Sequence, residues 1–297
     1  MKPQHIQILV AIAEHGSLRA AAKYLDKSQP ALTQSLRQAE SELGVSLFLR
    51  TSRGVELTKV GERVLVRART ITSEIARLDE EVAQLRGEQV GAVNVCLSPL
   101  AATQIMPRAL TLFRKTHPKI EVRLTSGLFP GALKPLREGR VDILVGPTPP
   151  AEMVREISVD PLLETPIDIV TAMHSPLLSA RLLSELSNAQ WIMIGVPRGP
   201  GDIFKQLFIE NNLAPPEALT TSESYFGALS LVERLGAVCT FPALLMQDVQ
   251  KAFQIAPIPI REKIAPLKIS LITRAGHPLT PAADALAMCI RRRVNSL

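Results

Sequence analysis

Hydrophobic and polar positions between residues 17 and 43 follow the spacing of two short amphipathic helices joined by a polar turn. Ser17 is suited to cap a first helix that runs to about Leu25. Ser28 is suited to cap a second helix, with Pro30 in its first turn. Apolar residues of the second helix recur every three or four positions and are expected to face inward: Ala31, Leu32, Leu36, Ala39 and Leu43. The pattern predicts a helix-turn-helix from Ser17 to Leu36.

The outward face of the second predicted helix carries Gln29, Thr33, Gln34 and Arg37. Glutamine and arginine side chains make paired hydrogen bonds to adenine and guanine edges, so this set suits a reader of the DNA major groove. An ordinary helical hairpin with a solvated polar face is the alternative that this segment alone leaves open.

The residues that follow predict a β-hairpin wing. Two short apolar runs, 47–49 and 55–57, flank a basic turn from Arg50 to Gly54. Basic side chains on such a wing suit backbone phosphates or a narrow minor groove. With an amphipathic helix upstream, residues 1–58 therefore predict a winged helix-turn-helix. Its candidate DNA-binding residues are Ser28, Gln29, Pro30, Thr33, Gln34, Arg37 and Arg53.

A long helix is predicted over residues 59–87. Its apolar residues form a seam close to a heptad repeat: Val60, Val64, Ala68, Ile71, Ile75, Leu78, Val82 and Leu85. A small winged domain cannot bury a seam of this length, so we expect a partner helix to cover it. Packing against the rest of the same chain is the alternative. Gly87 and Gly91 end the helix and predict a hinge at 88–91.

Beyond the hinge, strands and helices alternate. The segment 92–145 is expected to form strand, helix, strand, helix and strand, an order that predicts a parallel, doubly wound α/β sheet. A second unit with a similar alternation of strands and helices begins near Asp160. The C-terminal segment is then expected to complete the first unit. The predicted lobes are 92–161 with 268–297, and 162–267.

Several short sequence motifs of the N-terminal segment resemble those of the DNA-binding domain of the LysR-type transcriptional regulators. The matching residues are the alanines at 20–22, Ser-Gln-Pro-Ala at 28–31, Glu-x-x-Leu-Gly at 40–44, Leu-Phe-x-Arg at 47–50 and Thr-x-x-Gly at 58–61. The resemblance implies an effector domain similar to the two-lobed periplasmic binding proteins. The partners that it implies are double-stranded DNA, a second copy bound through the linker helix, a further dimer to make a homotetramer, a small-molecule effector and RNA polymerase.

Ligands of open α/β sheets bind beyond the carboxyl ends of strands, in the crevice between units. That rule nominates ten effector-binding residues: Ser98, Thr103, Leu128, Phe129, Gly146, Thr148, Val196, Pro197, Ser222 and Phe241. Ser98 also stands where many members of the resembled family place an effector-binding hydroxyl. Hydroxyls and helix-start N–H groups favour an organic acid. The alternative is that the hydroxyls cap helices and the apolar residues belong to the core.

Composition and charge agree with a nucleic-acid partner. The chain has 297 residues, a net charge of +6 and an isoelectric point near 9.4. Its positive charge is concentrated near the start, since residues 1–70 hold eleven Lys and Arg against six Asp and Glu. Residues 71–90, by contrast, carry a net charge of −3. The basic region is therefore the one predicted to meet DNA.

The remaining features favour a regulator without a cofactor. Cys96, Cys239 and Cys289 are widely spaced and are expected to be structural thiols, and neither they nor the histidines show metal-ligand spacing. We expect no signal peptide, no membrane span and a cytoplasmic location. An enzyme or a solute-binding protein built on the later lobes is the rival class, but no nucleophile elbow or Ser/His/Asp set supports catalysis.

Overall fold

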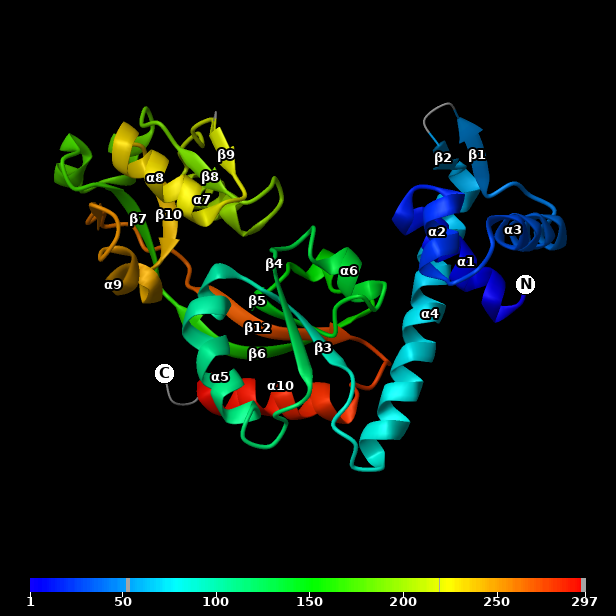
Figure 1. Ribbon diagram of the computed structural model, residues 1–297. Coiled ribbons are helices and arrows are strands. Elements are labelled where there is room, and N and C mark those ends of the chain that lie inside the picture. Colours follow the sequence, from blue (N-terminus) through cyan, green and yellow to red (C-terminus); the bar gives the residue numbers. More distant parts are fainter. Residues whose placement is uncertain (52–53, 219, 295–297) are drawn as a thin grey trace. The chain divides into compact units, whose positions relative to one another are not determined.

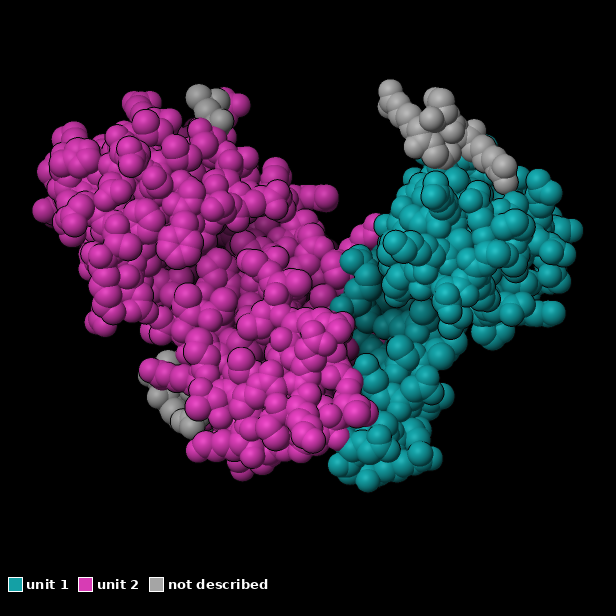
Figure 2. Space-filling view, in the orientation of Figure 1, with its two compact units in different colours: residues 1–88, 137–140 teal, residues 89–136, 141–297 magenta. Residues whose placement is uncertain are grey.

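The computed structural model describes residues 1–51, 54–218 and 220–294 (Figure 1). The chain divides into two compact units, which Figure 2 colours separately. The first unit holds residues 1–88 with 137–140, and the second holds residues 89–136 with 141–297.

Three helices open the first unit: α1 Pro3–His15, α2 Leu18–Tyr24 and α3 Gln29–Leu43. Ser17 and Ser28 cap α2 and α3, because each hydroxyl accepts a hydrogen bond from the backbone N–H three residues on, at 3.2 and 3.4 Å. The helix-turn-helix predicted from the pattern is therefore present, with the predicted caps.

The inward face of α3 is narrower than the sequence pattern indicates. Leu32, Leu36 and Ala39 are buried in the core of this unit, whereas Ala31 is exposed and Leu43 is 38% exposed. The prediction that both would face inward is wrong. Ala31 lies about 100° around the helix from Leu32, and Leu43 lies in the last helical turn, beyond the packed core.

The wing and the long helix follow in the predicted order. Strands β1 Phe48–Thr51 and β2 Gly54–Leu57 pair antiparallel, and Thr58 caps helix α4 Lys59–Leu85. The Thr58 hydroxyl accepts a hydrogen bond from the Gly61 N–H at 2.8 Å and donates one to the Ser46 carbonyl at 2.8 Å. The start of α4 is thereby tied to the chain that enters the wing.

Two further contacts fix the wing on the helices. The Glu40 carboxylate accepts hydrogen bonds from the N–H groups of Leu47, at 2.7 Å, and Phe48, at 3.2 Å. At Gly61, an added Cβ would lie 2.0 Å from the carbonyl oxygen of Leu47. Only glycine allows α4 to pass this close to the wing, and this close packing explains the glycine of the Thr-x-x-Gly motif.

The apolar seam of α4 divides into two parts. Leu65 and Ala68 are buried in the core of the first unit, and Val64 packs against it. Val60, at the start of the helix, is 44% exposed. The C-terminal part of the seam, which we call the linker stripe, has five side chains that are 39–71% exposed: Ile71, Ile75, Leu78, Val82 and Leu85. The sequence pattern missed Leu65, because the α4 face that meets the winged domain is rotated from the seam.

A five-stranded sheet in the order β4-β3-β5-β12-β6 forms the first lobe of the second unit (Figure 1). Strands β3 Ala92–Leu97, β4 Glu121–Ser126 and β5 Ile143–Pro147 are parallel. Strand β12 Leu267–Arg274 is antiparallel to β5 and to β6 Ile157–Thr165. The sheet is therefore mixed rather than wholly parallel, because the returning chain enters between β5 and β6 in the opposite direction.

Strand β6 also moves the boundary between the lobes. The division expected between residues 161 and 162 falls inside this strand, which pairs with β12 on both sides of a register shift at Leu162. The first lobe therefore extends through Thr165. Pro161, which has no N–H to donate, interrupts the strand pattern in the sequence.

Helices cover both faces of this sheet. A π-helical turn, Ala101–Ile105, leads into α5 Met106–Phe113, which packs against α10 Pro281–Val294 on one face (Figure 1). The short helix α6 Leu133–Arg137 contributes to a second cluster with Cys96, Leu144 and Ile272. Because side chains alternate along strands, this second cluster occupies the opposite face of the sheet.

The second lobe is a smaller α/β unit. Strand β7 Ile167–Ala172 lies between β10 Cys239–Pro242 and β11 Ile255–Pro257, antiparallel to both. Strands β8 Ile192–Ile194 and β9 Thr220–Ser222 pair in parallel. This lobe is therefore also mixed. Short 3₁₀ turns span Ala151–Met153, Pro176–Ser179, Leu183–Leu186, Pro200–Asp202 and Ala243–Leu245.

Helices α7 Ile203–Glu210, α8 Tyr225–Leu235 and α9 Met246–Val249 complete the second lobe. The buried Trp191 ring stacks on Phe204, with centroids 4.9 Å apart, and meets the edge of a further phenylalanine ring of α7. This aromatic cluster anchors α7 against the strands.

Candidate functional site

The exposed face of α3 is the first candidate site. Gln29, Pro30, Thr33, Gln34 and Arg37 line one open hollow together with Leu18 of α2. All of them except Thr33 and Leu18 are exposed. Ser28 is also exposed but uses its hydroxyl to cap α3. Arg53, predicted to contact DNA from the wing, lies outside the described residues.

The side chains of this face differ in what they can offer a ligand. The Thr33 hydroxyl donates to the Gln29 carbonyl at 2.9 Å, so its hydrogen is engaged within the helix and its methyl group and lone pairs remain. Within the described part of the chain, the side chains of Gln29, Gln34 and Arg37 make no hydrogen bond. Two amides and one guanidinium are therefore available to base edges or phosphates.

A cavity in the second unit is the second candidate site. Its volume is about 50 Å³, and its walls come from both lobes of the unit. Three of the ten predicted effector residues line it: Ser98 after β3, Leu128 after β4 and Phe241 in β10. The other lining residues are Pro99, Leu100, Pro147, Ile167, Ile194, Pro200, Gly201, Ile203, Tyr225, Thr240, Pro242, Leu267 and Ile269.

Ser98 is held firmly in the wall of this cavity. Its side chain is buried, its N–H donates to the Val145 carbonyl at 2.9 Å, and its hydroxyl accepts from the Ala101 N–H at 3.3 Å. Gly146 lies behind it, where an added Cβ would be 3.2 Å from the Cβ of Ser98. Gly146 therefore shapes the wall without lining the cavity.

An outer hollow adjoins the cavity and shares Pro147, Pro200, Ile203 and Leu267 with it. Phe129 and Thr148, both predicted effector residues, line this hollow instead. The Thr148 hydroxyl lies 2.6 Å from the Ser270 hydroxyl, so the two form a hydrogen bond.

Besides Gly146, four predicted residues line neither space. Thr103 is exposed on the π-helical turn and donates its hydroxyl to the Pro99 carbonyl at 3.0 Å. Val196 and Pro197 lie in the turn after β8, and the Ser222 hydroxyl donates to the Ser224 carbonyl at 2.9 Å. The strand-end rule placed these residues at the correct end of the sheets, but local turns direct their side chains elsewhere.

Tyr225 is a polar lining residue that the ten predicted residues do not include. It is the first residue of α8, directly after the cap Ser224, and its ring lies 5.3 Å from that of Phe241. The rule that selected Ser222 at the end of β9 does not extend to Tyr225, which begins the helix that follows.

The residues around the cavity are uncharged and disfavour ionisation of the groups among them. None of its described lining residues is charged. Burial, with a smaller effect of the nearby Cys239 thiol, raises the pKa of Tyr225 well above its usual value. Burial also raises the pKa of Cys239 to about 12. Both groups therefore stay protonated near neutral pH.

The described residues hold neither a metal cluster nor a membrane-spanning helix. They contain no group of three or more His, Cys, Asp or Glu that could hold a metal ion. A search of their helices also finds none that is both long enough and apolar enough to cross a membrane.

Two relatives illustrate what the chain is similar to. It is 26% identical over 290 residues to the HTH-type transcriptional regulator GalR of Pseudomonas putida, covering 97% of this chain and 73% of that protein. It is 25% identical over 291 residues to the HTH-type transcriptional regulator TdcA of Escherichia coli, covering 96% of this chain and 91% of that protein.

Solved structures show the same fold. The LysR family transcriptional regulator CbnR matches with a TM-score of 0.70 and 23% identity over 99% of both chains. A full-length OxyR variant from Pseudomonas aeruginosa matches with a TM-score of 0.70 and 22% identity, over 98% of this chain and 95% of that one.

Two family models match the chain itself. Residues 3–62 match the bacterial regulatory helix-turn-helix protein model of the lysR family, and residues 86–295 match the LysR substrate binding domain. These matches include α3 in the first and the cavity in the second. The protein belongs to the LysR family of transcriptional regulators.

Proposed function

We propose that this regulator binds double-stranded DNA through the exposed face of α3, with Gln29 and Gln34 at base edges and Arg37 at the phosphate backbone. The observation that carries the proposal is the hollow on α3, where two exposed amides and one guanidinium lie together without hydrogen-bond partners among the described residues. Support also comes from a solved relative of the same fold, CbnR, whose structure is a complex of the full-length protein with its target DNA.

A matched pair of glutamine variants tests the DNA-binding face. Gln34→Ala removes an amide that lines the hollow, whereas Gln38→Ala removes an exposed amide of the same helix that hydrogen-bonds Glu42 at 3.4 Å. We expect Gln34→Ala to change the preferred base at one position by about 1–3 kcal/mol. Gln38→Ala should leave the sequence preference unchanged.

The measurement is selection of bound sequences from a random duplex library, followed by mobility-shift titration of the selected sites at fixed salt. A Gln34→Ala protein that selects the same sequences with the same affinity would show that α3 does not read bases. Arg37→Ala, in contrast, should weaken binding to all duplexes alike and reduce its salt dependence.

A small-molecule effector in the cavity completes the proposed function. We propose that its occupancy changes DNA binding or transcription activation, and that the protein acts by binding rather than by catalysis, without a cofactor. The family models describe bacterial regulators with a substrate-binding domain, which supports both the effector and a cytoplasmic site of action.

We propose that the linker stripe joins two copies, that two such dimers form a tetramer, and that RNA polymerase is a further partner. The domain organisation proposed with this function is a winged helix-turn-helix at 1–58, a linker helix at 59–87, a hinge at 88–91, a first lobe at 92–165 with 268–297, and a second lobe at 166–267.

A further inference from the structure

The cavity has few polar side chains, and they differ in the hydrogen bonds that they make within the protein. The Ser98 hydroxyl accepts from the Ala101 N–H. The hydroxyl of Tyr225, in contrast, is buried and has no hydrogen-bond partner among the described residues. A buried phenol hydroxyl without a partner is destabilising by about 1–3 kcal/mol. Such a group is expected to find a partner when the cavity beside it is filled.

The geometry points to an effector that is uncharged and largely apolar, with one hydrogen-bond acceptor that accepts from the Tyr225 hydroxyl. This inference rests on the proposed function, because it assigns the chemical class of the molecule that the same cavity binds. It replaces the organic acid expected from the sequence.

Charge argues against an acid. An anion in the cavity would lose its hydration without meeting a described cationic side chain among the lining residues. The adjoining hollow offers Arg198, but Glu152 and Asp202 line the same space, so its carboxylates outnumber its arginine. Asp202 itself pairs with Lys205 at 2.9 Å and accepts a hydrogen bond from the Arg198 backbone N–H. Neither space therefore compensates a carboxylate.

The protonation state of Tyr225 fits a neutral acceptor. Burial holds the pKa of this phenol well above its usual value, so the hydroxyl keeps its proton and acts as a donor. A carbonyl or ether oxygen accepts from such a donor without bringing a charge into the apolar walls formed by Leu128, Ile194 and Phe241.

The cavity volume limits the ligand that this arrangement holds. A volume of about 50 Å³ restricts an enclosed ligand to a few non-hydrogen atoms. Butanone, isopentane and propionate are three probes of this size that share one branched skeleton. Butanone is a neutral acceptor, isopentane has no acceptor, and propionate is an anion, so the set separates shape from polarity and charge.

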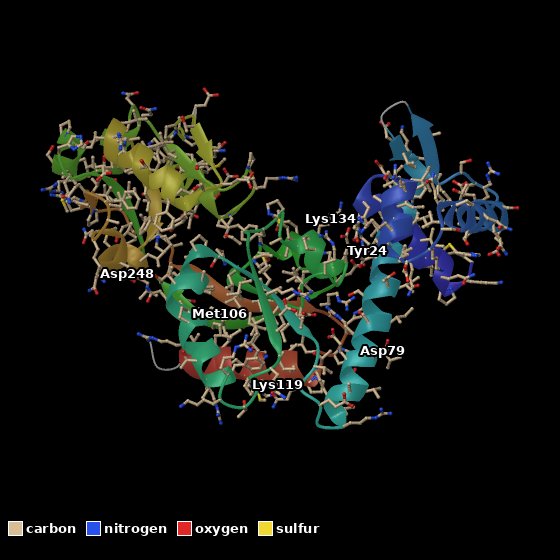
Figure 3. All side chains as sticks on the ribbon, in the orientation of Figure 1. Tyr24, Asp79, Met106, Lys119, Lys134 and Asp248 are labelled. Carbon is tan, nitrogen blue, oxygen red and sulfur yellow. The ribbon has the colours of Figure 1, made fainter. Side chains whose placement is uncertain are left out.

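Tyrosine labelling of the full-length protein follows the binding directly. The chain has two tyrosines, and Tyr24 lies in the first unit, at the end of α2 (Figure 3). With ¹³C at the phenol carbon, the Tyr24→Phe variant assigns both signals, and Tyr24 then serves as the internal control. We expect butanone, titrated to high millimolar concentration, to move the Tyr225 signal saturably and to leave the Tyr24 signal in place.

A hydroxyl deletion gives the second readout. Tyr225→Phe keeps the ring that packs on Phe241, and we expect it to weaken butanone binding about threefold to tenfold while leaving isopentane binding unchanged, as measured by saturation transfer to the probe. We also expect propionate not to bind at these concentrations.

Three results would overturn the inference: propionate moving the Tyr225 signal as readily as butanone, equal butanone affinity in the wild type and Tyr225→Phe, or no response of Tyr225 to butanone. The assay contains no DNA. Failure of the α3 variants to alter DNA recognition would therefore count against the proposed function alone, and failure here would count against the neutral ligand alone.

Discussion

Replacing Leu78 by glutamate in the middle of the linker stripe tests whether α4 joins two copies of the chain. Leu78 is 61% exposed in the single chain, and the stripe continues on both sides of it with Ile75 and Val82. Long apolar stripes at three- and four-residue spacing are stable in water only when a second surface covers them. We therefore expect wild-type protein to be at least dimeric and Leu78→Glu to dissociate it.

The expected magnitude follows from the exposure of the stripe. Full burial of one aliphatic side chain contributes about 1.5–3 kcal/mol. Five side chains with about half of their surface left to bury therefore supply about 4–8 kcal/mol per helix. Leu78→Glu loses about 1 kcal/mol of this from each copy and also buries a carboxylate opposite its own symmetry mate, at a cost of several kcal/mol. A total of about 4 kcal/mol raises the dimer Kd about a thousandfold.

Sedimentation velocity over a range of protein concentrations measures this change. The matched control is Val66→Glu, which introduces the same charge at a 37% exposed apolar position of α4 that lies outside the seam. We expect the control to sediment like the wild type. If Leu78→Glu also sediments like the wild type and protects the same length of DNA, the linker stripe does not form the interface.

Two further predictions concern stability and thiol chemistry. Gly61→Ala should lower the free energy of unfolding of the first unit by about 1–3 kcal/mol, because the new Cβ would clash with the Leu47 carbonyl. Urea denaturation measures this change, and Arg63→Ala is an exposed control in the same helix. Iodoacetamide at pH 8 should modify Cys289, which is half-buried, and spare Cys239, whose pKa of about 12 leaves almost no thiolate in the folded state. Modification of Cys239 in native protein, detected by mass spectrometry of peptides, would contradict that burial.

Local patterns predicted the elements that local physics determines. The caps Ser17 and Ser28 were recognisable because an N-cap needs only a side-chain oxygen beside the first helical turn. The first strand predicted in the segment 92–145 is present as β3, since a continuous apolar run between turn residues is typical of a buried strand. Strand β6, by contrast, was missed because Pro161 and alternating polar residues disguise it.

Features that depend on distant contacts could not be predicted. The antiparallel direction of β12 depends on where the chain returns after the second lobe. The residues of the strand itself do not indicate this direction. The same holds for the cavity. Ser98 and Leu128 follow their strands in the sequence, whereas Tyr225 reaches the cavity only because α8 packs against β7 and β8 and brings its ring to Phe241. Strand-end reasoning therefore selected three residues that line the cavity but not Tyr225, whose buried hydroxyl has no partner among the described residues.

The size of the cavity has a consequence for regulation. A ligand shifts a conformational equilibrium only through its difference in affinity for the two states, and couplings of 1–3 kcal/mol are typical. The two lobes are joined by the crossing from β6 to β7 and by the return from β11 to β12. A molecule that fills about 50 Å³ and pairs with Tyr225 stabilises the lobes as they stand. A larger molecule binds only when the lobes separate, so it stabilises a wider arrangement. Small and large ligands of the same chemistry should therefore act on DNA binding in opposite directions, and an analogue series of increasing chain length in the mobility-shift titration should show the change of sign.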